Sequence, residues 1–251
     1  MQQTDLLKEK VAQYSFDYLL KDIQRSNTSS DNLIWLGIGS GTTIKFFISI
    51  LGKKFAEDSI PFKFVTISSS VDSEMACRDF NLPIRQLADL PANQRLNYYI
   101  DGADEVDKFK RCLKGLGGAS TREKLLRLES EKFYVLTDEN KKVSSLCVKN
   151  PVVLEILPFG FEKTLERIKN FNPIPFNAEI RKGTGKMGFV ITDNNNYLVD
   201  AYFKIESADS YDFEELEQQL KSIPGVVETG LFAKPADVVF ISTKTSVEVF
   251  E

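Results

Sequence analysis

Glycines, hydroxyls, carboxylates and lysines gather in three short segments of the 251-residue chain. The first reads GIGSGTT at residues 37–43, the second DGADE at residues 101–105, and the third KGLGGASTREK at residues 114–124. Hydroxyl and backbone N–H groups bind anions, while carboxylates and lysines transfer protons or stabilise charge. These segments are therefore the candidates for a binding or acid–base site.

The first segment lies between two apolar runs, residues 33–36 and 44–51, and so joins an expected strand to an expected helix. Glycines let a backbone approach a ligand, and N–H groups at a helix N-terminus attract anions. Ser40, Thr42 and Thr43 add hydroxyl donors. The segment lacks the Gly-Lys-Ser/Thr of phosphate loops, and its glycines run GxGxG rather than GxGxxG. Two interpretations stay open: a phosphate site, or a tight turn with a Ser or Thr helix cap.

The second segment follows an apolar strand, residues 96–100. In open α/β sheets, ligands bind beyond the carboxyl ends of the strands. Asp101, Asp104 and Glu105 could bind a metal ion or sugar hydroxyls, or act as acid and base. A solvated acidic turn is the alternative, and it is the commoner case for such a motif.

The third segment places a lysine before a glycine-rich loop and a helix start. Ser120 and Glu123 match the S-x-x-E capping box, which gives Glu123 a structural explanation. The functional alternative makes Glu123 a general base with Lys114 as the neighbouring cation. Both can hold, because a capped helix start is a rigid mount for a catalytic carboxylate.

The composition excludes several classes of chemistry. The chain has no histidine, which removes Ser-His-Asp and Cys-His triads and His-ligated metals. Its three cysteines are widely spaced, which disfavours a disulfide framework or zinc site and fits a reducing compartment. The net charge of −4 disfavours a nucleic-acid partner. Charged residues near the N-terminus and short apolar runs predict neither signal peptide nor membrane segment, so we expect a cytoplasmic protein.

The pattern of apolar runs predicts two domains. Up to about residue 150, strands alternate with helices, which indicates a parallel sheet covered on both faces. The later part reads strand, helix, strand, strand, helix, strand, a ferredoxin-like α+β order. Its expected strands include 152–157, 188–192 and 197–203, the last two joined as a hairpin by residues 193–196, and its expected helices are 161–168 and 213–220. A last strand, 237–242, could return to the first sheet. We therefore expect an α/β protein with a Rossmann-like catalytic domain (residues 1–147 and 233–251) and a smaller α+β domain (148–232).

The three segments, in this order and spacing, resemble the type A ribose-5-phosphate isomerase family. Later segments agree, among them LEILPFG, ITDNNNYLVDAYF and IPGVVETGLFAKPADVVF, and the resemblance spans roughly residues 5 to 245. It implies an isomerase that interconverts ribose 5-phosphate and ribulose 5-phosphate in the pentose phosphate pathway, with no metal and no cofactor. It also implies that the protein forms a homodimer or homotetramer. The small molecule that it binds would be a sugar phosphate.

The resemblance assigns roles by position. Glu123 would be the general base that moves a proton between C2 and C1 through an enediol, and Lys114 would stabilise the enediolate oxygen. Asp101 and Asp104 would hold sugar hydroxyls and assist ring opening. Further residues fall on substrate-binding segments of the family: Ser40, Gly41, Thr42, Thr43, Gly102, Ala103, Gly115, Leu116, Gly117 and Lys141, with Lys8 matching an N-terminal phosphate ligand and Lys10 as its alternative.

Two departures from the family pattern stand out. Leu116 replaces a glycine of the family's KGGGGA, so its side chain could restrict the loop or crowd the substrate. Asn140 replaces the serine before Lys141. Neither change removes an acid–base residue.

The same residues leave two rival functions to consider. An amino-sugar-phosphate deaminase or CoA transferase would use another catalytic set, and the deaminase relies on a histidine. A catalytically silent sugar-phosphate sensor should carry a basic helix-turn-helix domain, and none is apparent. A sensor would also have no need of the base at Glu123.

Overall fold

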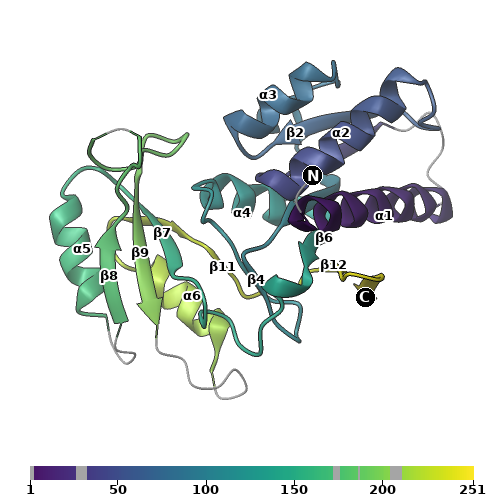
Figure 1. Cartoon of the computed structure of the whole chain (residues 1–251). Helices are drawn as coiled ribbons and strands as arrows, with labels where there is room; N and C mark the ends of the chain where they lie inside the picture. The colour runs from purple at the N-terminus through teal and green to yellow at the C-terminus, as the bar shows by residue number, and fades with distance from the viewer. Residues whose placement is uncertain (1–2, 27–32, 172–175, 186, 204–210) are drawn as a thin grey trace. The chain divides into compact units, whose positions relative to one another are not determined.

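The computed structural model describes residues 3–26, 33–171, 176–185, 187–203 and 211–251 (Figure 1). By their internal contacts they form two compact units. Unit 1 comprises Met1–Gly102, Leu125–Asn140 and Ala236–Glu251, and unit 2 comprises Ala103–Lys124 and Lys141–Pro235. The expected domains grouped residues 103–124, 141–147 and 233–235 with the parallel sheet, whereas by contacts they belong to unit 2.

Unit 1 is built on a six-stranded sheet with the order β13-β12-β6-β3-β1-β2. All neighbouring strands are parallel except the β12–β13 pair, so the expected parallel sheet is confirmed, as is the return of the C-terminal strand to it. The strands are β1 (Ile34–Ile38), β2 (Phe64–Ser68), β3 (Leu96–Gly102), β6 (Ser130–Asp138), β12 (Val238–Ser242) and β13 (Val247–Phe250). The helices are α1 (Gln3–Arg25), α2 (Thr42–Ala56), α3 (Val71–Asp79) and the end of α4 (Ser120–Leu128), with short 3₁₀ turns η1 (Leu87–Asp89) and η2 (Glu139–Lys141).

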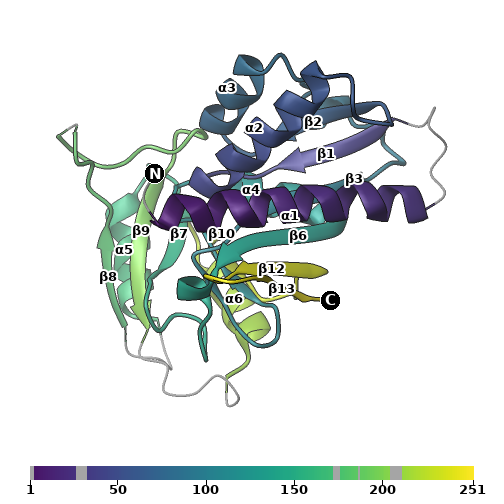
Figure 2. The ribbon, with the colours of Figure 1, turned by 45° about the vertical axis from the view of Figure 1, so that its right-hand side comes forward.

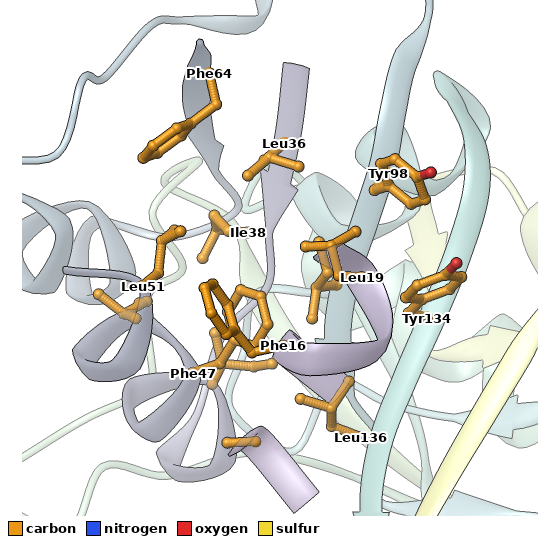
Figure 3. Packing of buried hydrophobic residues seen from close by; sticks show 14 of the residues in the cluster. Phe16, Leu19, Leu36, Ile38, Phe47, Leu51, Phe64, Tyr98, Tyr134 and Leu136 are labelled. Carbon is orange, nitrogen blue, oxygen red and sulfur yellow. The ribbon is translucent and has the colours of Figure 1, made fainter. Parts of the chain in front are cut away.

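The main core of unit 1 lies between one face of this sheet and the helices α1 and α2. Figure 2 shows α1 lying over the sheet, roughly along the direction of β6. Phe16 of α1 and Phe47 of α2 meet edge-on above Leu36 and Ile38 of β1, and all four are buried (Figure 3). Because β1 is buried along its whole length, it reads in sequence as a continuous apolar run.

A partly buried polar cluster ties α1 to the same face. The Asp22 carboxylate accepts hydrogen bonds from Tyr134 Oη at 2.5 Å, Lys132 Nζ at 2.6 Å and Tyr98 Oη at 3.0 Å. Burial alone would raise the pKa of Asp22, but these hydrogen bonds and the Lys132 charge outweigh it and hold the pKa below its usual value. Burial and the Asp22 charge raise the pKa values of Tyr98 and Tyr134, so both stay protonated donors.

Asp22→Asn is expected to lower the free energy of unfolding at pH 7 by about 1.5–3 kcal/mol, the range for hydrogen bonds to a charged group. A carboxylate whose folded pKa is depressed contributes stability above its unfolded pKa and loses it as pH falls through the folded pKa. The gap between wild type and variant should therefore shrink below about pH 4 in urea titrations. Asp17→Asn, on the exposed side of α1, is the control. A gap of equal size at pH 3 and pH 7 would contradict the assignment.

Unit 2 contains a four-stranded antiparallel sheet with the order β10-β7-β9-β8. With its two helices, this is the ferredoxin-like arrangement expected from the sequence. Its elements are β7 (Val152–Ile156), α5 (Phe161–Lys169), β8 (Phe176–Ile180), β9 (Tyr197–Phe203), α6 (Phe213–Lys221) and β10 (Val226–Thr229), and a three-stranded sheet adds β4 (Glu105–Val106), β5 (Cys112–Leu113) and β11 (Leu231–Phe232).

The two faces of the four-stranded sheet differ. Leu154, Val199 and Ala201 lie on the face that packs in the apolar core with residues of α5 and α6. Because side chains alternate along a strand, the opposite face presents Val153 and Glu155 of β7 beside Asp200 and Leu198 of β9. We call this second set the loop-bearing face.

The hairpin expected from residues 188–192 and 197–203 is formed only at its turn, where Ile191 pairs with Tyr197. The strand that pairs with β9 on its outer side is β8, and residues 188–192 make only isolated bridges, Lys182 to Phe189 and Ile191 to Tyr197. The turn at residues 193–196 is present, but its polar side chains are turned inward to Glu155. Turn composition therefore marked the right place, and tertiary contacts decided the partner strand.

In the described part of the chain, no helix is both long enough and apolar enough to cross a bilayer.

Candidate active site

The glycine segment of unit 1 forms the turn from β1 to α2. Gly41 is the N-cap of α2, with φ of 90°, and makes no side-chain capping bond. The expected Ser or Thr cap is therefore not formed. Thr42 is exposed and Thr43 half-buried, so the first turn of α2 presents its hydroxyls and backbone N–H groups to the surface. Such a helix start can bind an anion.

Asp101 lies at the end of β3 and is completely buried. Its Oδ1 accepts hydrogen bonds from the backbone N–H of Ser40 at 3.1 Å and of Gly102 at 2.7 Å. Its Oδ2 accepts a short hydrogen bond from the Tyr99 hydroxyl. The structure therefore brings two sequence-predicted residues, Ser40 and Asp101, into direct contact.

Gly39 leaves the space that the Asp101 carboxyl occupies. A Cβ at position 39 would lie 2.0 Å from both the carboxyl carbon and Oδ1 of Asp101. Gly39→Ala is therefore expected to push Asp101 aside, to destabilise the protein by about 1–3 kcal/mol and to lower activity by roughly tenfold. Gly185→Ala is the matched control, because a Cβ there meets open space at ordinary φ. Unchanged melting and turnover in Gly39→Ala would show that Asp101 need not be held in this position.

In unit 2, Asp104 holds the glycine-rich loop. Its Oδ2 accepts a hydrogen bond from the backbone N–H of Leu116 at 3.0 Å, and its own N–H donates to the carbonyl of Leu113 at 2.8 Å. Asp104 is half-buried, unlike Asp101. Its carboxylate is thus fixed beside the loop of the third segment.

Glu105, the third carboxylate of the acidic segment, has a structural role. It is completely buried and accepts hydrogen bonds from the backbone N–H groups of Cys147, Lys149 and Asn150 at 2.6–2.8 Å. These bonds anchor the segment that leads into β7. The cluster of three carboxylates considered from the sequence is therefore not formed, since Glu105 is committed to backbone donors.

Lys114 and Glu123 form a buried ion pair. Lys114 Nζ lies 3.3 Å from Glu123 Oε2, and each side chain is 4% exposed. The backbone N–H of Lys114 donates to Gly230 at 2.8 Å, which fixes the start of the loop. A buried carboxylate beside a single lysine is a suitable pair for proton transfer and for stabilising negative charge on a substrate oxygen.

The capping box expected from Ser120 and Glu123 is not formed. The helix already begins at Ser120, whose buried hydroxyl has no hydrogen-bond partner among the described residues. The N–H of Glu123 instead donates to the carbonyl of Ala119 at 3.0 Å. The side chain of Glu123 lies against Lys114 instead.

The loop between Lys114 and α4 is pressed onto the loop-bearing face. Gly115 and Gly118 have φ of 96° and 83°, a region that favours glycine. A Cβ at Gly115 would lie 3.3 Å from the Cβ of Val153, and one at Gly118 would lie 3.3 Å from Leu198. Leu116 is absent from the residues with positive φ, and its side chain is 38% exposed. A leucine therefore fits the backbone of this loop.

The first turn of α4 is anchored to Glu155, a completely buried residue that sequence reasoning missed. Glu155 accepts hydrogen bonds from Thr121 Oγ1 at 2.5 Å and from Asn194 and Asn196 at 3.0 and 2.8 Å. Arg122 donates to Asn194 Oδ1 at 2.8 Å. The only available signal in sequence was a charged residue inside an apolar strand, which predicts a buried carboxylate with partners.

Lys124, next to Glu123, is a structural lysine. It is buried, forms an ion pair with Glu217, and donates to the carbonyl of Leu231. Burial lowers its pKa, and the Glu217 charge opposes this. It serves to anchor α4 to the rest of unit 2.

The remaining sequence-predicted residues lie at element ends. Gly102 ends β3 and Ala103 begins unit 2, while exposed Gly117 follows Leu116 in the loop. Lys141 is half-buried at the end of η2. Lys8 lies on α1, and the nearby Lys10 donates to the carbonyls of Thr243 and Lys244 at 3.3 and 3.4 Å. Lys10 therefore already has backbone partners in the C-terminal segment.

Comparison with known proteins identifies relatives along nearly the whole chain. The model of the family described as ribose 5-phosphate isomerase A (phosphoriboisomerase A) matches residues 65–246. Ribose-5-phosphate isomerase A of Methanococcus vannielii is 39% identical, covering 99% of this chain and 94% of the relative. That of Pyrococcus horikoshii is 37% identical, covering 86% of this chain and 90% of the relative.

Solved structures agree. The structure of ribose 5-phosphate isomerase A from Methanocaldococcus jannaschii has a TM-score of 0.82 and 31% identity, covering 98% of both chains. A D-ribose-5-phosphate isomerase solved in complex with phospho-erythronic acid has a TM-score of 0.84 and 32% identity, covering 98% of this chain and 97% of that one. Fold and relatives together define an aldose–ketose isomerase. The chain belongs to the ribose 5-phosphate isomerase A family.

Proposed function

We propose that this protein interconverts D-ribose 5-phosphate and D-ribulose 5-phosphate through an enediol, with Glu123 as the general base. The observation that carries the proposal is the buried pair of Glu123 and Lys114, mounted on an anchored helix start. The relatives named for this reaction, and the one solved with phospho-erythronic acid, support the choice of substrate.

The reaction requires little beyond these groups. In the open-chain aldose, Glu123 removes the proton from C2, and the electron pair moves so that the C1 carbonyl oxygen gains negative charge. Lys114 stabilises that charge, because an ammonium in a buried site interacts strongly with a nearby anion. The hydroxyl on C2 then gives up its proton and the oxygen on C1 gains one. Glu123 returns its proton to C1, which leaves the carbonyl at C2. Asp101 and Asp104 hold the hydroxyls and assist ring opening.

The binding roles follow from the local structure. The start of α2, with Ser40, Gly41, Thr42 and Thr43, presents N–H and hydroxyl donors suited to a phosphate. Lys8 and Lys141 are proposed to add positive charge. Backbone groups of Gly102 and Ala103, and of Gly115, Leu116 and Gly117, are proposed to contact the sugar.

The cellular setting is also proposed. We place the enzyme in the cytoplasm, in the non-oxidative pentose phosphate pathway, because its three cysteines are free and buried and the family acts on ribose 5-phosphate by name. We expect a homodimer or homotetramer, no nucleic-acid partner, and no metal or cofactor requirement.

The test is formation of ribulose 5-phosphate from ribose 5-phosphate in D₂O with EDTA present. We expect activity, and deuterium at C1 of the product, because a proton carried by Glu123 exchanges with solvent during the enediol stage. Complete retention of protium at long incubation would favour a hydride shift instead. A folded protein that binds the sugar phosphate without turnover would favour a sensor.

A further inference from the structure

We propose that Arg181 is a positioning residue for the isomerase reaction, acting through the backbone of Leu116. The proposal rests on the function proposed above. Arg181 follows β8, far in sequence from the catalytic segments. Its Nη1 donates a hydrogen bond to the carbonyl of Leu116 at 2.8 Å and lies 3.5 Å from the carbonyl of Gly115.

The guanidinium itself is fixed by a bidentate ion pair. Its Nε and Nη2 donate to Oδ2 and Oδ1 of Asp200 at 2.9 and 2.5 Å. The two side chains are 17% and 14% exposed. The backbone of Arg181 is also hydrogen-bonded on both sides. Its N–H donates to the carbonyl of Leu198, and its carbonyl accepts from the N–H of Val190. A planar fork held in this way has little freedom, so it presents Nη1 in one direction.

Residue 116 is consequently held from two sides. Its carbonyl accepts from Arg181, and its N–H donates to Asp104 at 3.0 Å. A line of contacts thus runs from Asp200 through Arg181 and Leu116 to the carboxylate of Asp104. Because the N–H of Leu116 is bonded to the Asp104 carboxylate, a shift of Leu116 would move this carboxylate as well as the loop. Asp104 is a proposed catalytic residue, so such a shift would disturb the reaction.

The neighbouring glycines explain why the loop needs this support. Gly115 and Gly118 are conformationally permissive, so the loop between Lys114 and α4 is not rigid by its own covalent structure. Val153 and Leu198 leave little room beside these glycines, so they limit the loop on one side by steric exclusion alone. The directional bond from Arg181 sets the orientation of the peptide group after Leu116, and misplacement of a reacting group by about 1 Å can cost roughly 10²-fold in rate.

The test compares Arg181→Gln, Arg181→Lys and Asp200→Asn in steady-state assays and thermal melting. We expect Arg181→Gln to lower kcat by about 10- to 100-fold. Arg181→Lys should fall between it and the wild type, because an ammonium can reach one carbonyl but cannot form the fork with Asp200. Arg111→Gln is the matched control: it breaks another little-exposed Arg–Asp pair of unit 2, and should lower the melting temperature while leaving kcat within about twofold.

A double-mutant cycle with Asp104→Ala separates positioning from general stability. If Arg181 acts through Leu116 on Asp104, Arg181→Gln should change kcat by less than about threefold in the Asp104→Ala background. Equal fold-losses in both backgrounds, or wild-type kcat in Arg181→Gln, would overturn the proposal. If Arg181→Gln does not fold, the kcat losses of Arg181→Lys in the wild-type and Asp104→Ala backgrounds are compared by the same criterion. Absence of isomerase activity in the wild type would instead refute the proposed function and leave these contacts to be explained otherwise.

Discussion

Glu123→Gln is expected to lower kcat for the isomerisation of ribose 5-phosphate by about 10²–10⁴-fold, the usual contribution of an acid–base group. Glutamine keeps the size of the side chain, but it carries no charge to pair with Lys114 and cannot take a proton from carbon. Since Glu123 is buried 3.3 Å from Lys114, the variant should fold with the same helix start and a somewhat lower melting temperature.

The measurement pairs turnover with exchange. Deuterium uptake from D₂O into the sugar should fall with kcat, because both need the same base. Glu129→Gln, just beyond the end of α4 and exposed, is the control and should keep wild-type turnover. Near-wild-type kcat in Glu123→Gln, or exchange that persists while turnover is lost, would remove Glu123 from the role of base.

Lys114→Ala is expected to have the second largest effect, a loss of kcat of about 10²–10³-fold, as found when a donor to a developing oxyanion is removed. It should also lower the free energy of unfolding by about 3–5 kcal/mol, because Glu123 would keep a buried charge without its cation. Lys114→Met, which fills more of the same space, separates lost packing from lost charge.

Comparison with a second lysine makes this prediction specific. Lys124→Met also removes a buried lysine paired with a glutamate, Glu217, and should destabilise the protein. In the folded protein it should leave kcat nearly unchanged, since Lys124 is bound to structural partners. If Lys114→Ala changed only KM, Lys114 would contribute uniform binding rather than stabilisation of the transition state.

The elements of the parallel sheet could be predicted from the sequence. The strands β1, β2, β3 and β12 coincide closely with apolar runs, because strands buried on both faces must be apolar throughout. The segments that carry the candidate residues directly follow strands of this pattern or begin helices. Turn glycines and helix starts are determined locally, which is why short motifs reveal them.

The partners of buried polar groups could not be predicted in the same way. Glu105 and Asp104 belong to one acidic motif, yet one binds the backbone of residues 147–150 and the other binds Leu116. Ser120 and Glu123 match a capping box that the structure does not form, because the helix begins one residue earlier than the motif requires. A motif fixes which groups are present, and packing decides which of their possible partners lie within reach.

By itself, the sequence determined most strands of the parallel sheet, the family resemblance, and the types of residue that could perform acid–base chemistry without histidine. Only the tertiary structure decided that β8 is the outer neighbour of β9, that Glu155 anchors Thr121, and that Arg181 holds Leu116. The physical reason is the separation along the sequence between the residues that interact. Backbone conformation and burial pattern depend on residues a few positions apart, whereas these contacts join residues 34 and 65 positions apart. Such pairs are selected by the fold of the whole unit, because each buried polar group must find a partner among whatever the packing brings near.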